Sequence, residues 1–172
     1  MSKQLRESAE SCVDEERASV FLGLGSNLGD RVRNIESALG LLDASASVEV
    51  SEASGLYETP PEFFEAQGEF LNCAAAVRTS RGPHELLSCV KVIEKSMGRK
   101  ETFRYGPRII DIDILLYKSA IIKEKELFVP HPGLPERLFV LFPLAEIAGG
   151  AVHPLSGRSM EELLYLKLES KT

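Results

Sequence analysis

The chain has few of the residues that mark secreted, zinc-binding or membrane proteins. Its three cysteines, Cys12, Cys73 and Cys89, are odd in number and far apart, which fits neither a disulfide framework nor a zinc site. There is no run of about 18 apolar residues, so no membrane-spanning helix is expected. Residues 1–18 lack the apolar segment of a secretory signal. These absences favour a reducing, cytoplasmic location.

A positive net charge is missing as well. The 20 basic and 26 acidic side chains give a formal charge of −6, which argues against general binding to nucleic acid or to anionic membranes. A phosphate-binding site would therefore need a local basic cluster. Residues 99–108 provide one, because this segment contains four basic residues and only one acidic residue. These are Arg99, Lys100, Arg104 and Arg108, with Glu101.

The glycine-rich loops that hold nucleotide phosphates are also absent. No Gly-x-x-x-x-Gly-Lys-Ser/Thr motif occurs in the chain. Residues 23–29 contain three glycines, but they have one residue too many for a dinucleotide fingerprint, and the chain does not continue as a doubly wound sheet. A bound nucleotide would therefore be held by arginine side chains and metal.

The length of 172 residues, of which 44% are hydrophobic and 27% charged, is typical of one soluble globular domain. We expect a flexible extension over 1–18 and a single domain over 19–172. Hydrophobic patterns predict, in order, strand, helix, strand, strand, helix and strand. The strands are expected over 19–25, 48–57, 70–79 and 109–117, and the helices over 32–42 and 83–97.

This order predicts an α+β fold with a ferredoxin-like core (βαββαβ), in which helices pack on one face of a mostly antiparallel sheet. The residues after this core are predicted to form a C-terminal appendage. It contains an extended segment over 127–132, an apolar helix around Pro143, and a last helix. Ser159 and Glu162 have the spacing of a capping box for that last helix.

The strand over 109–117 carries two acidic residues, Asp111 and Asp113, on one face, since side chains alternate along a strand. The opposite face is apolar, with Ile110, Ile112, Ile114 and Leu116. Two buried neighbouring carboxylates repel each other unless cations neutralise them. Oxygen ligands without sulfur or imidazole favour magnesium, and such a pair can bracket two ions about 3.5–4 Å apart. The alternative is two solvated aspartates on an edge strand.

Arg104 and Arg108 directly precede this acidic strand, so cations for phosphate would lie beside ligands for metal, which indicates phosphoryl chemistry. Two further features have two readings each. Phe63 and Phe64, in the loop after Pro61, could form a lid or cover the core. His131, between two prolines, could contact a ligand or be structural.

Taken together, these stretches resemble the 6-hydroxymethyl-7,8-dihydropterin pyrophosphokinases of folate biosynthesis. The resemblance runs in order from about residue 20 to residue 164. Its most specific part is Gly-Pro-Arg-x-x-Asp-x-Asp at 106–113, followed by Val-Pro-His-Pro at 129–132. Other matching segments are 24–31, 57–61, 70–72, 93–94, 98–99, 104–105 and 137–139.

The resemblance implies an ATP- and magnesium-dependent enzyme that transfers the terminal diphosphate of ATP to the pterin hydroxymethyl group and releases AMP. It implies two Mg²⁺ ions on Asp111 and Asp113. For the pterin, it implies binding by Thr59, Pro60, Phe70, Asn72 and Phe139. For ATP, it implies binding by Glu94, Arg99, Arg108, His131 and Arg137, with Arg99 and Arg108 as catalytic residues. No obligate protein partner is expected.

The chain departs from the common pattern of this family at several positions. Tyr105 stands where tryptophan is usual, and relatives often place nucleotide contacts at the positions of Lys91, Glu101, Glu126 and Phe128. A catalytically inactive relative that still binds pterin or nucleotide is therefore an alternative. An RNA-recognition module, which shares the strand and helix order, would need stacking aromatics and a basic face, and this acidic chain offers only Phe21 and Phe70 on the relevant strands.

Overall fold

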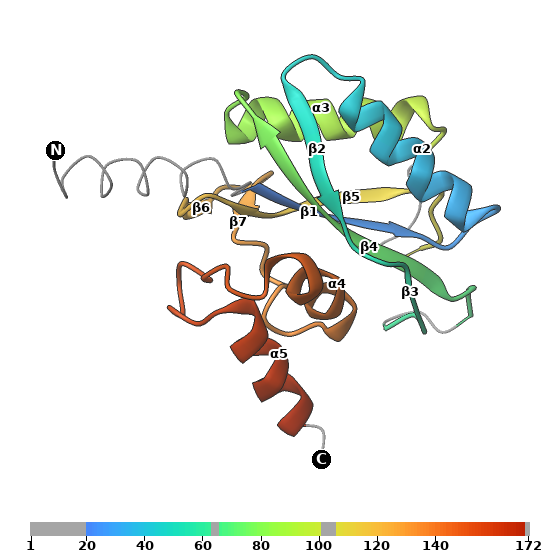
Figure 1. Cartoon of the computed structure of the whole chain (residues 1–172). Helices are drawn as coiled ribbons and strands as arrows, with labels where there is room; N and C mark the ends of the chain where they lie inside the picture. Colours follow the sequence, from blue (N-terminus) through green and yellow to red (C-terminus); the bar gives the residue numbers. More distant parts are fainter. Residues whose placement is uncertain (1–19, 63–65, 101–105, 171–172) are drawn as a thin grey trace, which may run out of the picture.

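An antiparallel sheet forms the centre of the protein. The computed structural model describes residues 20–62, 66–100 and 106–170, and within these the main sheet has five strands (Figure 1). The strands are β1 (Val20–Ser26), β2 (Val48–Ala53), β3 (Tyr57–Thr59), β4 (Phe70–Thr79) and β5 (Asp111–Tyr117). Their order is β2-β4-β1-β5, and β3 extends the sheet by pairing with β4. All of these pairings are antiparallel.

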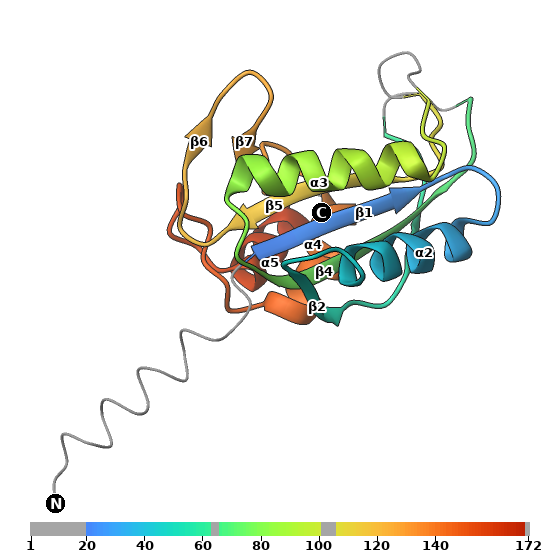
Figure 2. The same cartoon turned by 90° about the horizontal axis from the view of Figure 1, so that it is seen from above.

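Helices cover both faces of this sheet. Helices α2 (Arg31–Asp43) and α3 (Pro83–Ser96) lie on one face, and α4 (Leu138–Ala148) and α5 (Met160–Glu169) lie on the other (Figures 1 and 2). Each face has its own apolar core. Alternate side chains of β4 enter different cores, so that Cys73 packs towards α2 and α3 and Ala74 packs towards α4.

Local sequence signals set where the helices begin. The side chain of Asp30 accepts a hydrogen bond from the Arg33 amide at 3.1 Å and caps α2. Pro83 occupies the first turn of α3, where its missing N–H leaves no intrahelical bond unmade. Ser159 and Glu162 form the predicted capping box at the start of α5.

The segment predicted as a C-terminal appendage builds the second layer. After β5 the chain forms a small hairpin of β6 (Ile122–Lys123) and β7 (Phe128–Val129), which the sequence pattern did not predict. The Val129–Pro130 peptide bond is cis, and the His131 amide donates to the carbonyl of Leu115 at 2.9 Å. Helix α4 contains Pro143 and packs against β4.

Two sequence predictions differ from the observed strands. The strand predicted over 48–57 is split into β2 and β3, because Ser54–Leu56 leave the ladder and Tyr57 re-enters it opposite Asn72. The prediction that Leu116 shares the isoleucine face is wrong. The β1–β5 register shifts between Phe21 and Leu22, and this bulge turns Leu116 to the α4 side together with Leu115.

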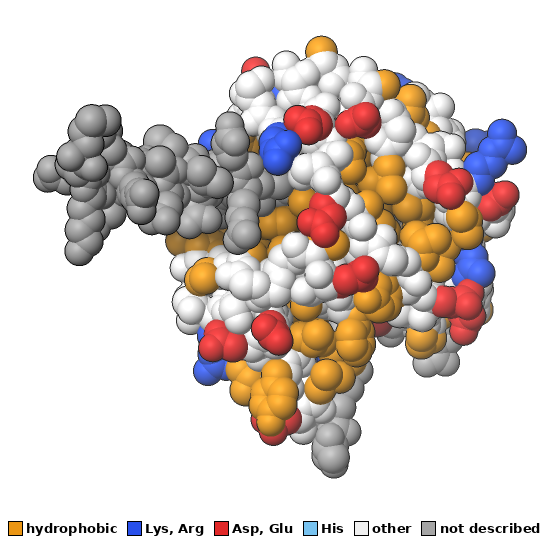
Figure 3. All heavy atoms as spheres, viewed as in Figure 1, with side chains coloured by type: hydrophobic (Ala, Val, Ile, Leu, Met, Phe, Trp, Pro, Cys, Tyr) orange, Lys and Arg blue, Asp and Glu red, His pale blue; other side chains and the backbone are white. Residues whose placement is uncertain are grey.

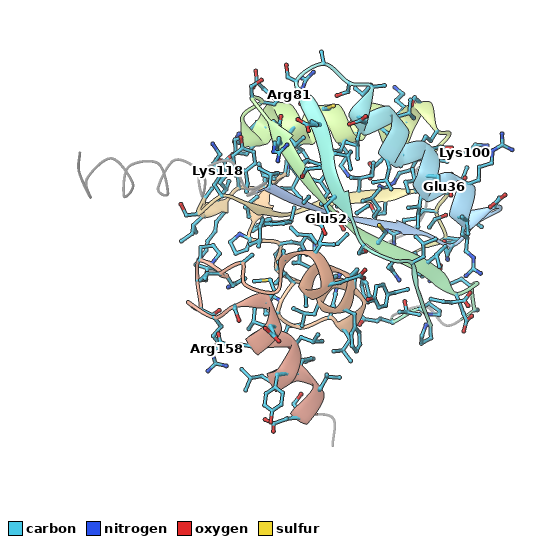
Figure 4. All side chains as sticks on the ribbon, in the orientation of Figure 1. Glu36, Glu52, Arg81, Lys100, Lys118 and Arg158 are labelled. Atoms are coloured by element: carbon cyan, nitrogen blue, oxygen red, sulfur yellow. The ribbon has the colours of Figure 1, made fainter. Side chains whose placement is uncertain are left out.

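The surface charges are dispersed. Figure 4 shows Arg81, Lys100, Lys118 and Arg158 at separate points on the periphery. In Figure 3 acidic side chains are scattered over the visible face, and apolar side chains gather around α5. Among the helices that the structure describes, none combines the length and apolar character needed to cross a membrane.

We predict that Leu22→Ala lowers the free energy of unfolding by about 2–5 kcal/mol, because Leu22 is fully buried in the central strand and its truncation leaves a cavity. Urea unfolding measures this change. Val92→Ala is the control, since Val92 is 67% exposed on α3 and should change stability by only about 0.5 kcal/mol. Equal effects of the two substitutions would contradict the assigned core.

Candidate active site

A cavity of about 330 Å³ lies between the sheet and α4, which is within the size range of small-molecule sites. Its lining includes ten of the twelve residues that the sequence predicted for the site. These are Thr59, Pro60, Phe70, Asn72, Arg99, Arg108, Asp111, Asp113, Arg137 and Phe139. The other two are close by: Glu94 is buried beneath Arg99, and His131 approaches Asp113. Residues from both layers thus meet at one site.

Glycines on β1 lie opposite the acidic pair on β5. Gly25 pairs with Asp111 and Gly23 pairs with Asp113, so each aspartate has a glycine as its cross-strand neighbour on the same face. A β-carbon on Gly25 would meet the Asn72 Oδ1 at 3.3 Å, and one on Gly23 would meet Leu115 at 3.2 Å. Both aspartates and both glycines line the cavity.

Two arginines neutralise Asp111. Its Oδ1 accepts a hydrogen bond from Arg99 at 2.6 Å, and its Oδ2 accepts one from Arg108 at 2.5 Å. Burial alone would raise the pKa of Asp111, but the guanidinium groups of Arg108 and Arg99 outweigh this effect and hold the pKa below its ordinary value. Asp111 is therefore an anion, and its charge is already partly balanced.

Asp113 has no such neutralising partner. Among the described residues no hydrogen bond reaches its carboxylate, and the Nε2 of His131 lies 4.0 Å from its Oδ2. Burial, together with repulsion from Asp111, raises the pKa of Asp113 to about 7. The side chain is nevertheless 43% exposed, since it faces the cavity. It is thus available to a cation that arrives with a ligand.

The acidic pair suits magnesium bound together with a phosphate ligand. In the part of the chain that the structure describes, no cluster of three or more His, Cys, Asp or Glu side chains could hold a metal by itself. Magnesium is commonly held by one or two carboxylates and completes its shell with water and substrate phosphates. Asp111 and Asp113 meet that requirement from the protein side.

Glu94 contacts both the basic residues of the site and the strand that carries the acidic pair. This carboxylate is only 2% exposed and pairs with Arg99 and with Lys91, the latter at 3.0 Å. It also accepts a hydrogen bond from the backbone N–H of Ile112 at 2.7 Å. Glu94 therefore joins α3, Arg99 and the acidic strand. Lys91, which the sequence singled out only as a departure from the family pattern, also lines the cavity.

The other end of the cavity is formed by aromatic and amide groups. The Asn72 Nδ2 donates to the Thr59 Oγ1 at 2.8 Å, which joins β3 to β4 at the cavity wall. Phe70 lies on β4 and Phe139 lies on α4, so the two rings come from opposite layers. Such groups suit a flat heterocycle with a polar edge.

Arg108 and Arg137 link the aromatic and charged ends of the cavity. The Arg108 guanidinium lies 5.8 Å from the centroid of Phe70, and that of Arg137 lies 5.7 Å from the centroid of Phe139. Arg137 also pairs with Glu62, with an Nε to Oε2 distance of 3.5 Å. Burial lowers the pKa of His131, and the charge of Arg137 adds to this effect. Five residues that the sequence analysis singled out lie outside the described residues, namely Phe63, Phe64, Glu101, Arg104 and Tyr105.

Asn27 is a site residue whose role the sequence pattern did not reveal. Its side-chain Oδ1 accepts a hydrogen bond from the backbone N–H of Arg108 at 2.8 Å, and its backbone N–H donates to the Arg108 carbonyl at 3.1 Å. Its Nδ2 donates to the Gln67 Oε1 at 2.9 Å and to the Gly68 carbonyl at 3.2 Å. Asn27 thus fixes the turn that carries Arg108. Asn27 lies in the segment 24–31 that resembles the family, but the sequence indicated no role for it.

We predict that Asp113→Asn becomes more stable relative to the parent protein as the pH rises from about 5 to about 8 in magnesium-free buffer. The folded pKa of about 7 lies above the unfolded value of about 3.9, so ionisation of Asp113 destabilises the folded protein as the pH rises through 7. We expect a relative gain of about 1–2 kcal/mol, less than the full shift implies, since water screens this carboxylate. Urea unfolding at the two pH values measures it, with Glu36→Gln on α2 as the control. A difference independent of pH would contradict the assignment.

This chain is similar to several known proteins. A family model described as 7,8-dihydro-6-hydroxymethylpterin-pyrophosphokinase (HPPK) matches residues 21–149. Two proteins named 2-amino-4-hydroxy-6-hydroxymethyldihydropteridine pyrophosphokinase are similar to this chain. That of Aquifex aeolicus (strain VF5) is 47% identical over 145 residues, which cover 84% of this chain and 89% of the relative. That of Bacillus subtilis (strain 168) is 47% identical over 127 residues, which cover 74% and 76%.

Solved structures show the same fold. The crystal structure of Plasmodium falciparum HPPK-DHPS with pteroate matches with a TM-score of 0.71 at 18% identity, over 87% of this chain. The match covers 42% of the Plasmodium chain, so this chain spans less than half of that protein. The identity to the bacterial relatives and the extent of the family match lead to one conclusion: this chain belongs to the 7,8-dihydro-6-hydroxymethylpterin-pyrophosphokinase family.

Proposed function

We propose that this protein transfers the β,γ-diphosphate of ATP to the hydroxymethyl group of 6-hydroxymethyl-7,8-dihydropterin, releases AMP, and serves tetrahydrofolate biosynthesis. The observation that carries the proposal is the composition of a single cavity. One end has two carboxylates and three arginines, and the other end has an asparagine, a threonine and two aromatic rings. Metal-bound phosphates and a flat heterocycle can therefore be bound side by side.

The pterin occupies the aromatic end. Phe70 and Phe139 stack on its two faces, since each ring comes from a different layer. Thr59 and Asn72 hydrogen-bond its polar edge, and Pro60 packs beside it. A pterin edge needs both donors and acceptors, which the Asn72 amide and the Thr59 hydroxyl supply.

The triphosphate occupies the basic end. Arg99, Arg108, Arg137 and His131 bind its oxygens there. The Nε of Arg108 supports this role, because it is buried and has no hydrogen-bond acceptor among the described residues. An arriving phosphate would supply the missing acceptor, since guanidinium groups pair well with phosphate oxygens. Glu94 keeps Arg99 in place for this contact.

Asp111 and Asp113 would hold two Mg²⁺ ions that enter with ATP. When bound, these ions neutralise phosphate charge and orient the oxygens of the triphosphate. Arg99 and Arg108 bind Asp111 in this structure, so they must share or release that carboxylate when the nucleotide binds.

The reaction follows from the arrangement of charge. The pterin hydroxyl oxygen attacks the β-phosphorus in line, and the bond from that phosphorus to the bridging oxygen of the α-phosphate breaks. AMP leaves with that oxygen, and the hydroxyl proton is released to solvent. Arg99 and Arg108 stabilise the negative charge that develops on the transferred group. Positioning and charge stabilisation provide most of the catalysis in phosphoryl transfer.

Further parts of this proposal concern the whole chain. The β2-β4-β1-β5 order with α2 and α3 on one face supports a ferredoxin-like core that carries a C-terminal addition on the other face. We infer a single domain over residues 19–172, and the extension expected over 1–18 lies outside the described residues. A cytoplasmic location and activity without an obligate protein partner complete the proposal.

The decisive experiment incubates the protein with ATP, Mg²⁺ and 6-hydroxymethyl-7,8-dihydropterin and identifies the nucleotide product. We expect AMP, formed only when pterin is present. ADP would indicate another phosphoryl transfer and would overturn the proposal. Binding of pterin or ATP without turnover would instead favour the catalytically inactive relative.

We predict that Arg108→Ala lowers the single-turnover rate by roughly 10²–10³-fold, the scale of one lost charge-stabilising donor. Arg78→Ala is the matched control, because Arg78 lies on β4 and pairs with Glu49 outside the cavity. Rapid-quench measurement of AMP formation gives both rates. An unchanged rate in the Arg108 variant would remove this residue from its proposed role.

A further inference from the structure

Glu146 lies on the same face of α4 as the aromatic wall of the cavity. Residues three, four and seven positions apart share a helix face, so Phe139, Phe142, Pro143 and Glu146 project in one direction. Phe139 and Pro143 line the cavity. Glu146 lies one turn beyond Pro143, outside the cavity lining. It is the polar end of the stripe that faces β3.

The Glu146 carboxylate holds the segment that begins β3. Its two oxygens accept from the Gly55 amide at 3.1 and 3.2 Å, and Oε2 also accepts from the Tyr57 hydroxyl at 2.8 Å. The Tyr57 ring stacks on Phe142, with centroids 6.1 Å apart and planes inclined by 13°. The bond to Glu146 raises the pKa of Tyr57, which keeps its hydroxyl protonated as a donor. One carboxylate thus binds a backbone group and a side chain of the same short segment.

Strand β3 needs an external support. It has only three residues, and within the described chain its only strand partner is β4. The preceding residues, Ser54–Leu56, interrupt the ladder between β2 and β3. A three-residue strand at the edge of a sheet is weakly fixed by its backbone bonds alone. The bonds from Glu146 provide the support from the opposite layer.

The position of β3 determines one wall of the cavity. Tyr57 and Thr59 are two residues apart and therefore share a face of the strand. Thr59 lines the cavity and accepts from Asn72, whereas Tyr57 reaches α4. Movement of β3 away from α4 would therefore displace Thr59 relative to Phe139.

We propose that Glu146 is a positioning residue that clasps β3 to α4 and so sets the separation of the Thr59 and Phe139 walls between which the heterocycle binds. The clasp itself follows from the contacts above, and the identity of the heterocycle rests on the proposed function. Glu146 is exposed, so its bonds contribute little to global stability. Their effect is on the geometry of one end of the cavity.

The test compares Glu146→Gln, Glu146→Ala and Tyr57→Phe with the parent protein in steady-state kinetics. We expect the KM for pterin to rise about tenfold in Glu146→Ala and less in Glu146→Gln, which keeps one acceptor for the Gly55 amide. The KM for ATP should stay within about twofold, because the phosphate groups lie at the other end of the cavity. Tyr57→Phe keeps the stacked ring and should resemble Glu146→Gln.

Glu169→Gln is the matched control. Glu169 accepts from the Tyr165 hydroxyl at 2.8 Å on α5, the same kind of pair at the same distance, but it does not line the cavity. This variant should leave both KM values unchanged. Equal rises in the pterin and ATP KM values of Glu146→Ala, or no rise in either, would overturn the proposal.

Amide hydrogen exchange of the ligand-free protein provides a readout that does not depend on the substrate. In Glu146→Ala, exchange of residues 55–59 should quicken at least tenfold, while exchange in β1 stays unchanged. Unchanged exchange at 55–59 would refute the clasp. If the parent protein neither binds nor converts pterin, the proposed function fails, and the exchange result still decides whether Glu146 holds the strand.

Discussion

The balance of charge around β5 is the constraint on which the rest of the structure depends. Asp111, Asp113 and the buried Glu94 bring three carboxylates close to one strand, where burial and repulsion from the other two carboxylates raise the pKa of Asp113. Arg99, Arg108 and Lys91 provide the compensating cations. The compensation is uneven, because Asp111 receives two guanidinium groups and Asp113 receives none among the described residues. The site is thus stable as it stands and still has a carboxylate with which to bind a cation.

The second layer turns this charged strand into a binding site. A sheet with helices on one face would leave the aspartates, Asn72 and Phe70 open to water. Helix α4 covers that face and supplies Phe139, while Arg137 at its N-terminus extends the basic end. The side chains of Arg108 and Asp111 are only 20% exposed there, so water screens their interaction less than it would on a free surface.

Much of this arrangement could be predicted from local patterns. Alternation along a strand placed Asp111 and Asp113 on one face, and the spacing of Ser159 and Glu162 marked the start of α5. The family resemblance then identified residues that line one cavity, although their roles in binding remain predictions. Those signals work because they depend on the geometry of a few consecutive residues.

The features that the sequence did not reveal depend on distant partners. The bulge that turns Leu116 away from the isoleucine face arises from pairing with β1, almost a hundred residues earlier in the chain. The contacts of Asn27 with Arg108 span 81 positions, and the bonds of Glu146 to Gly55 span 91. The break between β2 and β3 likewise involves a distant partner, because the Gly55 N–H within it donates to Glu146 on α4.

The glycines opposite the aspartates have a consequence for how the cavity can adapt. Gly23 and Gly25 lack β-carbons, so part of the cavity lining is main chain, which is fixed by hydrogen bonds to the strands on either side and has the Leu115 and Asn72 side chains packed against it. The main chain at these two glycines has no side-chain rotamers to change. Adjustment to different ligands must therefore come from the side chains that line the cavity, and discrimination of ligand shape next to Gly23 and Gly25 should be strict.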